Sequence, residues 1–226
     1  MQKRFTLLLK HNNSNQMNIL IISASQRDDS NSFKLSESIK NNVFDGQSNL
    51  TSSILDISQY PFLLDHYGYG RDNNAQLQDD KDTVLSKLYA CDAVVIVVPE
   101  WGGMIPPALV NLLLLCANGS ASGLPLGHKP AFPIGLSTSA GGSNPISLLK
   151  AYAAKNTHLT WLPLHAIVHN VENFIASPWT PDSQDRVSQV QSRISTGLKA
   201  LEIYANSLKP VREQLVELSK VHPFGQ

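Results

Sequence analysis

The chain has 226 residues, 42% of them hydrophobic, which is enough apolar material for the core of one α/β domain. Its 18 basic and 18 acidic residues cancel, so there is no net charge to attract DNA, RNA or an anionic membrane. No apolar run approaches the roughly 20 residues that span a bilayer, which argues against membrane insertion.

Residues 1–16 are expected to form a disordered extension. An apolar run at 5–9 imitates a secretory signal, but it is shorter than the roughly 7–15 residues of a signal core. Met17 directly precedes the first apolar strand, so we expect one domain over residues 17–226. Cys91 and Cys116 form no CxxC motif, which is typical of buried free thiols in a reducing cytoplasm. We therefore expect a cytoplasmic protein.

Apolar runs and amphipathic patterns alternate along this domain. Short runs predict buried strands at residues 18–23, 53–57, 93–98, 131–137 and 160–169. Helical spacing predicts helices at residues 32–44, 79–89, 106–117, 144–155 and 182–208. This alternation predicts a three-layer α/β sandwich in which helices cover both faces of a five-stranded parallel sheet. The flavodoxin-like strand order 2-1-3-4-5 fits best, and it places a ligand crevice at the carboxyl ends of strands one and three.

The loop after the first strand carries the strongest functional signal. It joins a buried strand to the N-terminus of a helix, where free N–H groups and the helix dipole favour anions. The loop adds three hydroxyls, from Ser25, Ser30 and Ser32, and the guanidinium of Arg27. Both kinds of group donate to phosphate oxygens, so the loop predicts a phosphomonoester site. An ordinary loop with a serine helix cap is the alternative.

Two further loops are expected at the same sheet edge. After the third strand, two glycines permit close backbone approach and a tryptophan offers an aromatic face. After the fourth strand, residues 137–143 are small and hydroxyl-rich. Together the three loops predict a cradle for a planar molecule that carries a phosphate, and FMN meets that description. The candidate ligand-binding residues of these two loops are Pro99, Glu100, Trp101, Gly102, Ser137, Ser139 and Gly141. A tight turn whose tryptophan packs on a neighbour is the alternative for the second loop, and for its glutamate we favour a capping or solvated role over a general base.

These loops resemble the motifs of the NADPH-dependent FMN reductase family, which has the flavodoxin-like fold and includes quinone, azo and chromate reductases. Residues 24–32 (ASQRDDSNS) are similar to the family's G-S-x-R-x-x-S-x-N phosphate loop, and residues 99–106 (PEWGGMIP) to its P-E-Y-N-x-x-x-P element. Residues 108–111 (ALVN) and 127–130 (GHKP) resemble its A-L-K-N and G-K-P elements. Four positions depart from the pattern, namely Ala24, Ser32, Trp101 and Gly102.

The resemblance implies a flavoenzyme that transfers hydride from NADPH or NADH to FMN and passes electrons to a quinone, azo, flavin or metal-ion acceptor. Because the flavin supplies the chemistry, no catalytic side chain and no metal site are expected. In this interpretation Ser25, Arg27, Ser30 and Ser32 hold the phosphate, the main chain of residues 99–102 faces the ring, and residues 137–142 close the pyrimidine side. We expect a homodimer or homotetramer. We expect the C-terminal helix mainly to cover the sheet, and a role in forming the dimer is the alternative.

Two other functions compete with this interpretation. A flavodoxin-type electron carrier would have a T-x-T-G-x-T loop and an acidic surface, and the sequence has neither. A non-flavin regulatory α/β module of the receiver type needs clustered acidic residues at strand ends, for which only Asp28, Asp29 and Asp56 are candidates.

Overall fold

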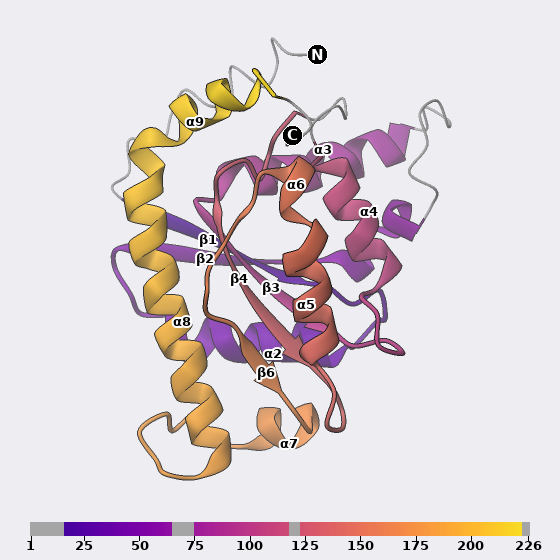
Figure 1. Ribbon diagram of the computed structural model, residues 1–226. Helices are drawn as coiled ribbons and strands as arrows, with labels where there is room; N and C mark the ends of the chain where they lie inside the picture. The colour runs from indigo at the N-terminus through magenta and orange to yellow at the C-terminus, as the bar shows by residue number, and fades with distance from the viewer. Residues whose placement is uncertain (1–15, 65–74, 118–122, 223–226) are drawn as a thin grey trace.

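The computed structural model describes residues 16–64, 75–117 and 123–222 (Figure 1). The expected N-terminal extension lies outside the described residues, apart from Gln16. A twisted parallel sheet forms the centre of the molecule. Its main strands are β1 (Met17–Ser23), β2 (Leu50–Asp56), β3 (Ala93–Pro99) and β4 (Pro130–Leu136). With the short edge strand β5 (Thr160–Trp161), the strand order is β2-β1-β3-β4-β5 and every pair is parallel, which confirms the predicted flavodoxin-like order.

The last strand differs from the prediction of one strand over residues 160–169, which was wrong. It is split into β5 (Thr160–Trp161) and β6 (Ala166–Val168), and both pieces pair with β4. The N–H of Leu162 still donates to the carbonyl of Ala131 at 3.0 Å. Pro163 follows and has no N–H to donate, so the ladder is interrupted there.

The helices lie close to their predicted positions. They are α2 (Asn31–Ile39), α3 (Ala75–Ala90), α4 (Pro107–Leu115), α5 (Ser143–Tyr152), α6 (Ala154–Thr157), α7 (Val171–Ala176), α8 (Arg186–Leu208) and α9 (Arg212–Ser219). A π-helical segment (Lys40–Phe44) continues α2, and 3₁₀ turns occur at Ile57–Gln59, Pro61–Leu64 and Lys209–Val211. The sequence did not predict α7, because six residues are too few to show a helical period.

Alternating side chains of the buried strands divide the core into two layers. Leu20 and Ile22 of β1 belong to the cluster that α3, α4 and α5 cover. Ile19 and Ile21 belong to the cluster that α2 and α8 cover on the other face. Helices therefore lie on both sides of the sheet, as Figure 1 shows, and the predicted three-layer sandwich is confirmed.

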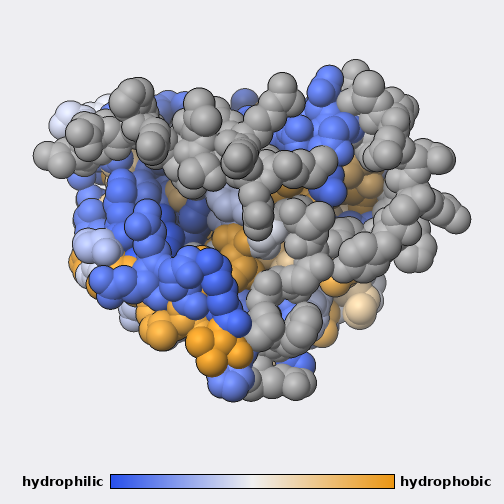
Figure 2. All heavy atoms as spheres, turned by 90° about the horizontal axis from the view of Figure 1, so that it is seen from above, coloured by the Kyte–Doolittle hydropathy of each residue, from blue (hydrophilic) through white to orange (hydrophobic). Residues whose placement is uncertain are grey.

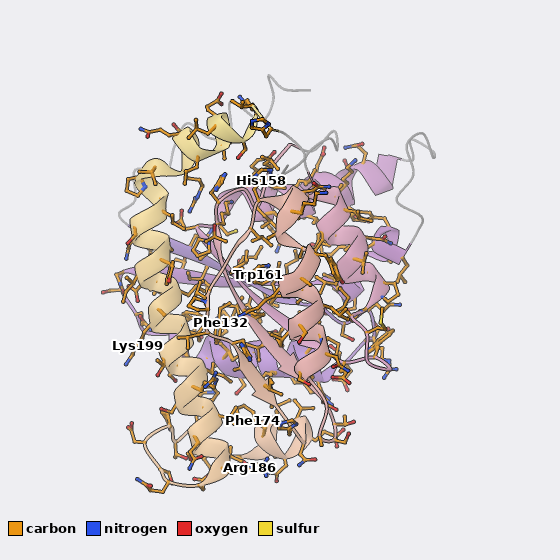
Figure 3. The ribbon with its side chains drawn as sticks, in the orientation of Figure 1. Phe132, His158, Trp161, Phe174, Arg186 and Lys199 are labelled. Atoms are coloured by element: carbon orange, nitrogen blue, oxygen red, sulfur yellow. The ribbon has the colours of Figure 1, made fainter. Side chains whose placement is uncertain are left out.

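The long helix α8 lies very close to the sheet at Gly197. Phe132 points from β4 toward this helix (Figure 3) and is fully buried. A Cβ atom at Gly197 would lie 2.2 Å from the Phe132 ring, so only glycine lets the helix approach this far. The buried residues of α8 include Ile194, Leu198 and Leu201, which shows that the helix covers the sheet as expected.

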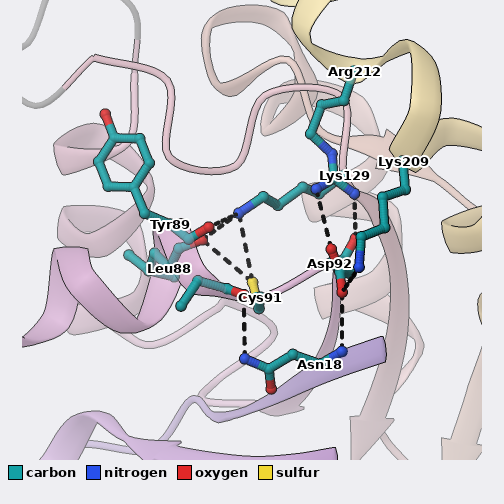
Figure 4. Close-up of polar contacts among 9 residues, drawn as sticks. Asn18, Leu88, Tyr89, Cys91, Asp92, Lys129, Lys209 and Arg212 are labelled. Atoms are coloured by element: carbon teal, nitrogen blue, oxygen red, sulfur yellow. Dashed lines mark hydrogen bonds and ion pairs between the residues drawn. The ribbon is translucent and has the colours of Figure 1, made fainter. Parts of the chain in front are cut away.

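A polar network joins elements at the amino ends of the strands (Figure 4). The buried Lys129 donates to the carbonyls of Leu88 and Tyr89 at the end of α3, at 2.5 Å and 2.9 Å. Burial lowers the pKa of this lysine because it disfavours the charged amine. Asp92 accepts from the N–H of Asn18 and from Lys209, each at 3.0 Å. The network fastens the C-terminal segment to the sheet.

The end of the molecule near α9 is seen from above in Figure 2. Hydrophilic residues gather on the left of this face, with hydrophobic residues next to them. Within the described part of the chain, no helix has both the length and the apolar character needed to cross a membrane.

Candidate functional site

A cavity of about 520 Å³ lies at the carboxyl ends of the strands, at the opposite end of the sheet from the Lys129 network. It brings together the predicted phosphate residues Ser25, Arg27, Ser30 and Ser32. The predicted ring-side residues that also line it are Pro99, Glu100, Trp101, Gly102 and Ser137. Ser139 and Gly141 do not line the cavity. The residues of the three loops lie close together because β1, β3 and β4 are neighbours in the sheet.

The loop after β1 is shaped by its own hydroxyl groups. The Ser25 hydroxyl oxygen accepts from the N–H of Arg27 at 3.2 Å. Ser30 is the N-cap of α2, and its hydroxyl oxygen accepts from the N–H of Phe33, also at 3.2 Å. Because each hydroxyl uses its oxygen as an acceptor, its hydrogen stays available to donate. Both serines can therefore shape the loop and donate to an anion at the same time.

Ser32 is different, because its hydroxyl is buried and unpartnered. The residue is 1% exposed, lines the cavity, and its Oγ has no hydrogen-bond partner among the described residues. A buried hydroxyl without a partner costs about 1–3 kcal/mol of stability. The first N–H groups of a helix also lack intrahelical acceptors, and Asn31 and Ser32 occupy those positions in α2. The site thus presents unsatisfied donors, which fits a phosphate oxygen.

Two cationic side chains line the cavity, and they differ in their partners. Lys34 forms an ion pair with Asp29 at 3.1 Å. Arg27 is exposed and forms no ion pair with any described residue. Its guanidinium carbon lies 4.6 Å from the centroid of the Trp101 ring. Arg27 is therefore the cation available to an anionic ligand.

The loop after β3 forms a tight turn. The main-chain groups of Trp101 and Met104 exchange two hydrogen bonds of 2.9 Å. Between them, Gly102 and Gly103 have φ values of 56° and 81°, as the two central residues of a type I′ turn require. A residue with a side chain rarely adopts such angles, so the glycines permit the turn.

This turn leaves fewer free N–H groups than the sequence predicted for residues 99–102. Pro99 has none, and the N–H of Glu100 donates to the carbonyl of Leu136 at 3.0 Å. The N–H of Trp101 is used within the turn. Within residues 99–102, only Gly102 thus keeps an N–H to offer to a planar ligand.

The loop after β4 supports the wall of the cavity. Glu100 accepts from the N–H of Gly142, the N-cap of α5, at 2.5 Å, which is the capping option of the capping or solvated role expected for it. A Cβ atom at Gly141 would lie 3.1 Å from the Glu100 carboxyl group. Ser139 donates its N–H to the Ser137 hydroxyl at 3.1 Å and accepts from the N–H of Asn170 at 3.0 Å. Ser139 and Gly141 therefore shape the loop behind the cavity wall.

The sequence analysis gave no role in the flavin site to several residues that line the wall, namely Asp28, Asp29, Asn31, Lys34, Leu136 and Glu172. The spacing of Asn31 and Lys34 along one helix face was a usable signal. Glu172 lies in the first turn of α7, and its Oε1 accepts a long 3.5 Å hydrogen bond from Asn31 Nδ2. No local pattern could have revealed this contact, because it depends on where β6 ends.

The sequence and the fold match known proteins. A family model described as NADPH-dependent FMN reductase matches residues 17–172. An oxidoreductase from Corynebacterium diphtheriae is 15% identical with a TM-score of 0.60, and the match covers 86% of this chain and 99% of that one. The flavoenzyme NAD(P)H:(acceptor) oxidoreductase FerB from Paracoccus denitrificans is 19% identical with a TM-score of 0.54, over 86% and 98% of the two chains. RosB, solved with bound 8-demethyl-8-formylriboflavin-5′-phosphate, is 14% identical with a TM-score of 0.62, over 91% and 87%. No curated protein sequence matches this chain.

Proposed function

The chain belongs to the family of NADPH-dependent FMN reductases, and from this premise we propose that the cavity at the carboxyl ends of β1, β3 and β4 is its FMN site. The protein is a flavin-dependent oxidoreductase that uses FMN, with NAD(P)H as the electron donor. The single observation that carries the location is the unpartnered hydroxyl of Ser32 at the N-terminus of α2. We also propose that residues 17–226 form one FMN-binding domain.

The phosphate end of the site is formed by the β1–α2 loop. Ser32 donates its unused O–H, and Ser25 and Ser30 donate the hydrogens that the loop leaves free. Arg27 supplies the positive charge, because Lys34 is already paired with Asp29. Charge-assisted hydrogen bonds to a dianion are stronger than bonds between neutral groups, so each bond at this end contributes more affinity than a neutral hydrogen bond would.

The ring end is formed by the two loops after β3 and β4. The N–H of Gly102 donates to a polar atom of the ring, and the Trp101 turn and Ser137 form walls beside it. Glu100 holds the α5 end of the wall through its bond with Gly142. When bound, FMN accepts hydride from the nicotinamide and passes electrons on, so the side chains need only bind, orient and shield it from water.

The nicotinamide donor would bind only transiently at the flavin site. The sequence has no G-x-G-x-x-G motif after a strand, so no separate Rossmann site for the nicotinamide is expected. We propose that the acceptor is a small oxidant, such as a quinone, an azo compound, a free flavin or a metal ion. We further propose a homodimer or homotetramer in the cytoplasm, and light scattering of the purified protein tests the oligomer.

Anaerobic titration of the FMN-loaded protein tests this function. NADPH or NADH is added without any partner protein while the visible flavin absorbance is followed. We expect the flavin colour to bleach, and to return when a quinone or azo dye is added. A flavodoxin-type carrier would keep its colour until a partner reductase was supplied. A protein that binds no FMN even at excess would contradict the proposed site.

A further inference from the structure

Arg27 and Trp101 come from different loops and stack on each other beside the cavity. Arg27 belongs to the β1–α2 loop and Trp101 to the turn after β3, and both side chains line the cavity. The guanidinium carbon lies 4.6 Å from the ring centroid, which is within the range of a cation–π contact. The stack therefore joins the phosphate end of the site to its ring end.

The two partners differ in how firmly they are held. Trp101 is half-buried, and its main chain is fixed in the turn by two hydrogen bonds of 2.9 Å to Met104. Arg27 is exposed, and its side chain has no acidic partner among the described residues. A free arginine side chain samples many rotamers, and binding has to select one of them. The fixed indole restricts that choice.

Stacking does not use up the hydrogen-bonding capacity of the guanidinium. Its N–H groups lie in the plane of the guanidinium and point outward from its edge, whereas the indole contacts its face. One arginine can therefore stay on the ring while two of its N–H groups grip a phosphate. The nearby cation Lys34 does not compete for the indole, because it is paired with Asp29 at 3.1 Å.

We propose that Trp101 is a positioning residue for Arg27, holding the guanidinium ready for the phosphate group of the flavin. The inference rests on the proposed FMN site and deepens it. It assigns to Trp101 a role in selecting phosphorylated flavin over riboflavin, although the residue lies on the loop assigned to the ring. Trp101 acts through Arg27 in this account and is not a catalytic residue.

Binding of two flavins that differ only in the phosphate tests the proposal. The dissociation constants of FMN and riboflavin for the flavin-free protein are measured by quenching of flavin fluorescence. Trp101→Leu should weaken FMN binding by about 2- to 30-fold, as loss of one cation–π contact predicts. Riboflavin binding should change by less than about twofold. Trp101→Phe keeps an aromatic face and should restore part of the FMN affinity.

Arg27→Met provides the second arm. In that background Trp101→Leu should have no further effect on FMN, because the group that it positions is gone. Met104→Ala is the matched control, since Met104 lies in the same turn, is 58% exposed and does not line the cavity. It should leave the affinity for both flavins unchanged. Thermal unfolding of each variant shows whether it is folded.

The outcomes separate this proposal from the proposed function. If the unaltered chain binds neither flavin, the FMN site itself is wrong. If Trp101→Leu weakens FMN and riboflavin equally, Trp101 contacts the ring and the positioning role is wrong. The positioning role is also wrong if Trp101→Leu weakens FMN binding by the same factor in the unaltered chain and in Arg27→Met. If Trp101→Leu does not fold, Trp101→Phe takes its place. The positioning role then requires that Trp101→Phe lower the ratio of FMN to riboflavin affinity when Arg27 is present and leave it unchanged in the Arg27→Met background.

Discussion

The Glu100 carboxylate accepts a 2.5 Å hydrogen bond from the N–H of Gly142, which joins the loop after β3 to the N-terminus of α5. The backbone around this contact is tightly constrained. A Cβ atom at Gly135 would lie 2.0 Å from the carbonyl oxygen of Gly142, so β4 and the loop pass as closely as glycine permits. Two walls of the cavity are thus held by one side chain.

Removing this side chain should loosen both walls. Glu100→Ala leaves the N–H of Gly142 without its charged acceptor, and we expect the free energy of unfolding to fall by about 1–3 kcal/mol. Glu100→Gln keeps an acceptor oxygen at the same place and should lose less. Urea unfolding of the flavin-free protein measures both changes. Equal stability of Glu100→Ala and the unaltered chain would show that the contact does not hold the loops.

Ser32→Ala should change affinity and stability in opposite directions. The hydroxyl has no partner in the flavin-free protein, so its removal should leave the free energy of unfolding unchanged or higher. A hydrogen bond to a charged group is worth about 1.5–3 kcal/mol, so FMN should bind about 10- to 150-fold more weakly. Fluorescence titration and urea unfolding give the two quantities.

Ser36→Ala is the matched control for that variant. Ser36 lies one turn further along α2, is also buried, and donates to the carbonyl of Ser32 at 2.7 Å. Its loss should leave FMN affinity within about twofold of the original. Similar losses of affinity in both variants would mean that the helix, and not the Ser32 hydroxyl, is responsible.

Gly197→Ala should destabilise the fold, although alanine favours helices. In an exposed helix interior the change would add about 1 kcal/mol of stability. Here the new Cβ would lie 2.2 Å from the Phe132 ring, and overpacking costs about 1–3 kcal/mol. Thr196→Ala, at the neighbouring exposed position, controls for helix propensity and should not lower the melting temperature. A more stable Gly197→Ala would show that α8 can move away from β4.

Acid should destabilise the protein through His128. Its Nε2 atom lies 2.8 Å from the Ser219 hydroxyl, which links the residue before Lys129 to α9. Burial, with smaller effects of His158 and Arg212, lowers the pKa of His128 below its usual value of 6.5, and a bond with the Leu215 carbonyl opposes this. As the pH falls through 6.5 the unfolded chain takes up the proton first, so stability is lost until the folded pKa is passed.

Urea unfolding at about pH 7.5 and pH 5.5 measures this loss, and His128→Gln should reduce the difference. Burial also lowers the pKa of His165, so part of the dependence should remain in the variant. An unchanged difference between the two pH values in His128→Gln would assign the effect to other groups.

The order of the sheet and the position of the phosphate loop could be predicted from the sequence. Both depend on local patterns, namely apolar runs of strand length and a hydroxyl-rich turn before a helix. The same patterns placed Ser25, Arg27, Ser30 and Ser32 at one cavity, because all four lie in the short stretch between the end of β1 and the first turn of α2. The break in the last strand at Pro163 was missed, since the apolar residues around it extend across the interruption.

The amino-acid sequence by itself therefore determined the layers of this protein and the loops that meet at its sheet edge. Only the tertiary structure decided how those loops meet. Gly102 and Gly103 have positive φ angles, and the turn that they form engages the N–H of Trp101 in a hydrogen bond. The sheet places Arg27 against the Trp101 ring, and α7 places Glu172 beside Asn31. Each of these relationships depends on backbone angles or on contacts between residues distant in the chain, and the periodicity of a sequence carries no information about either.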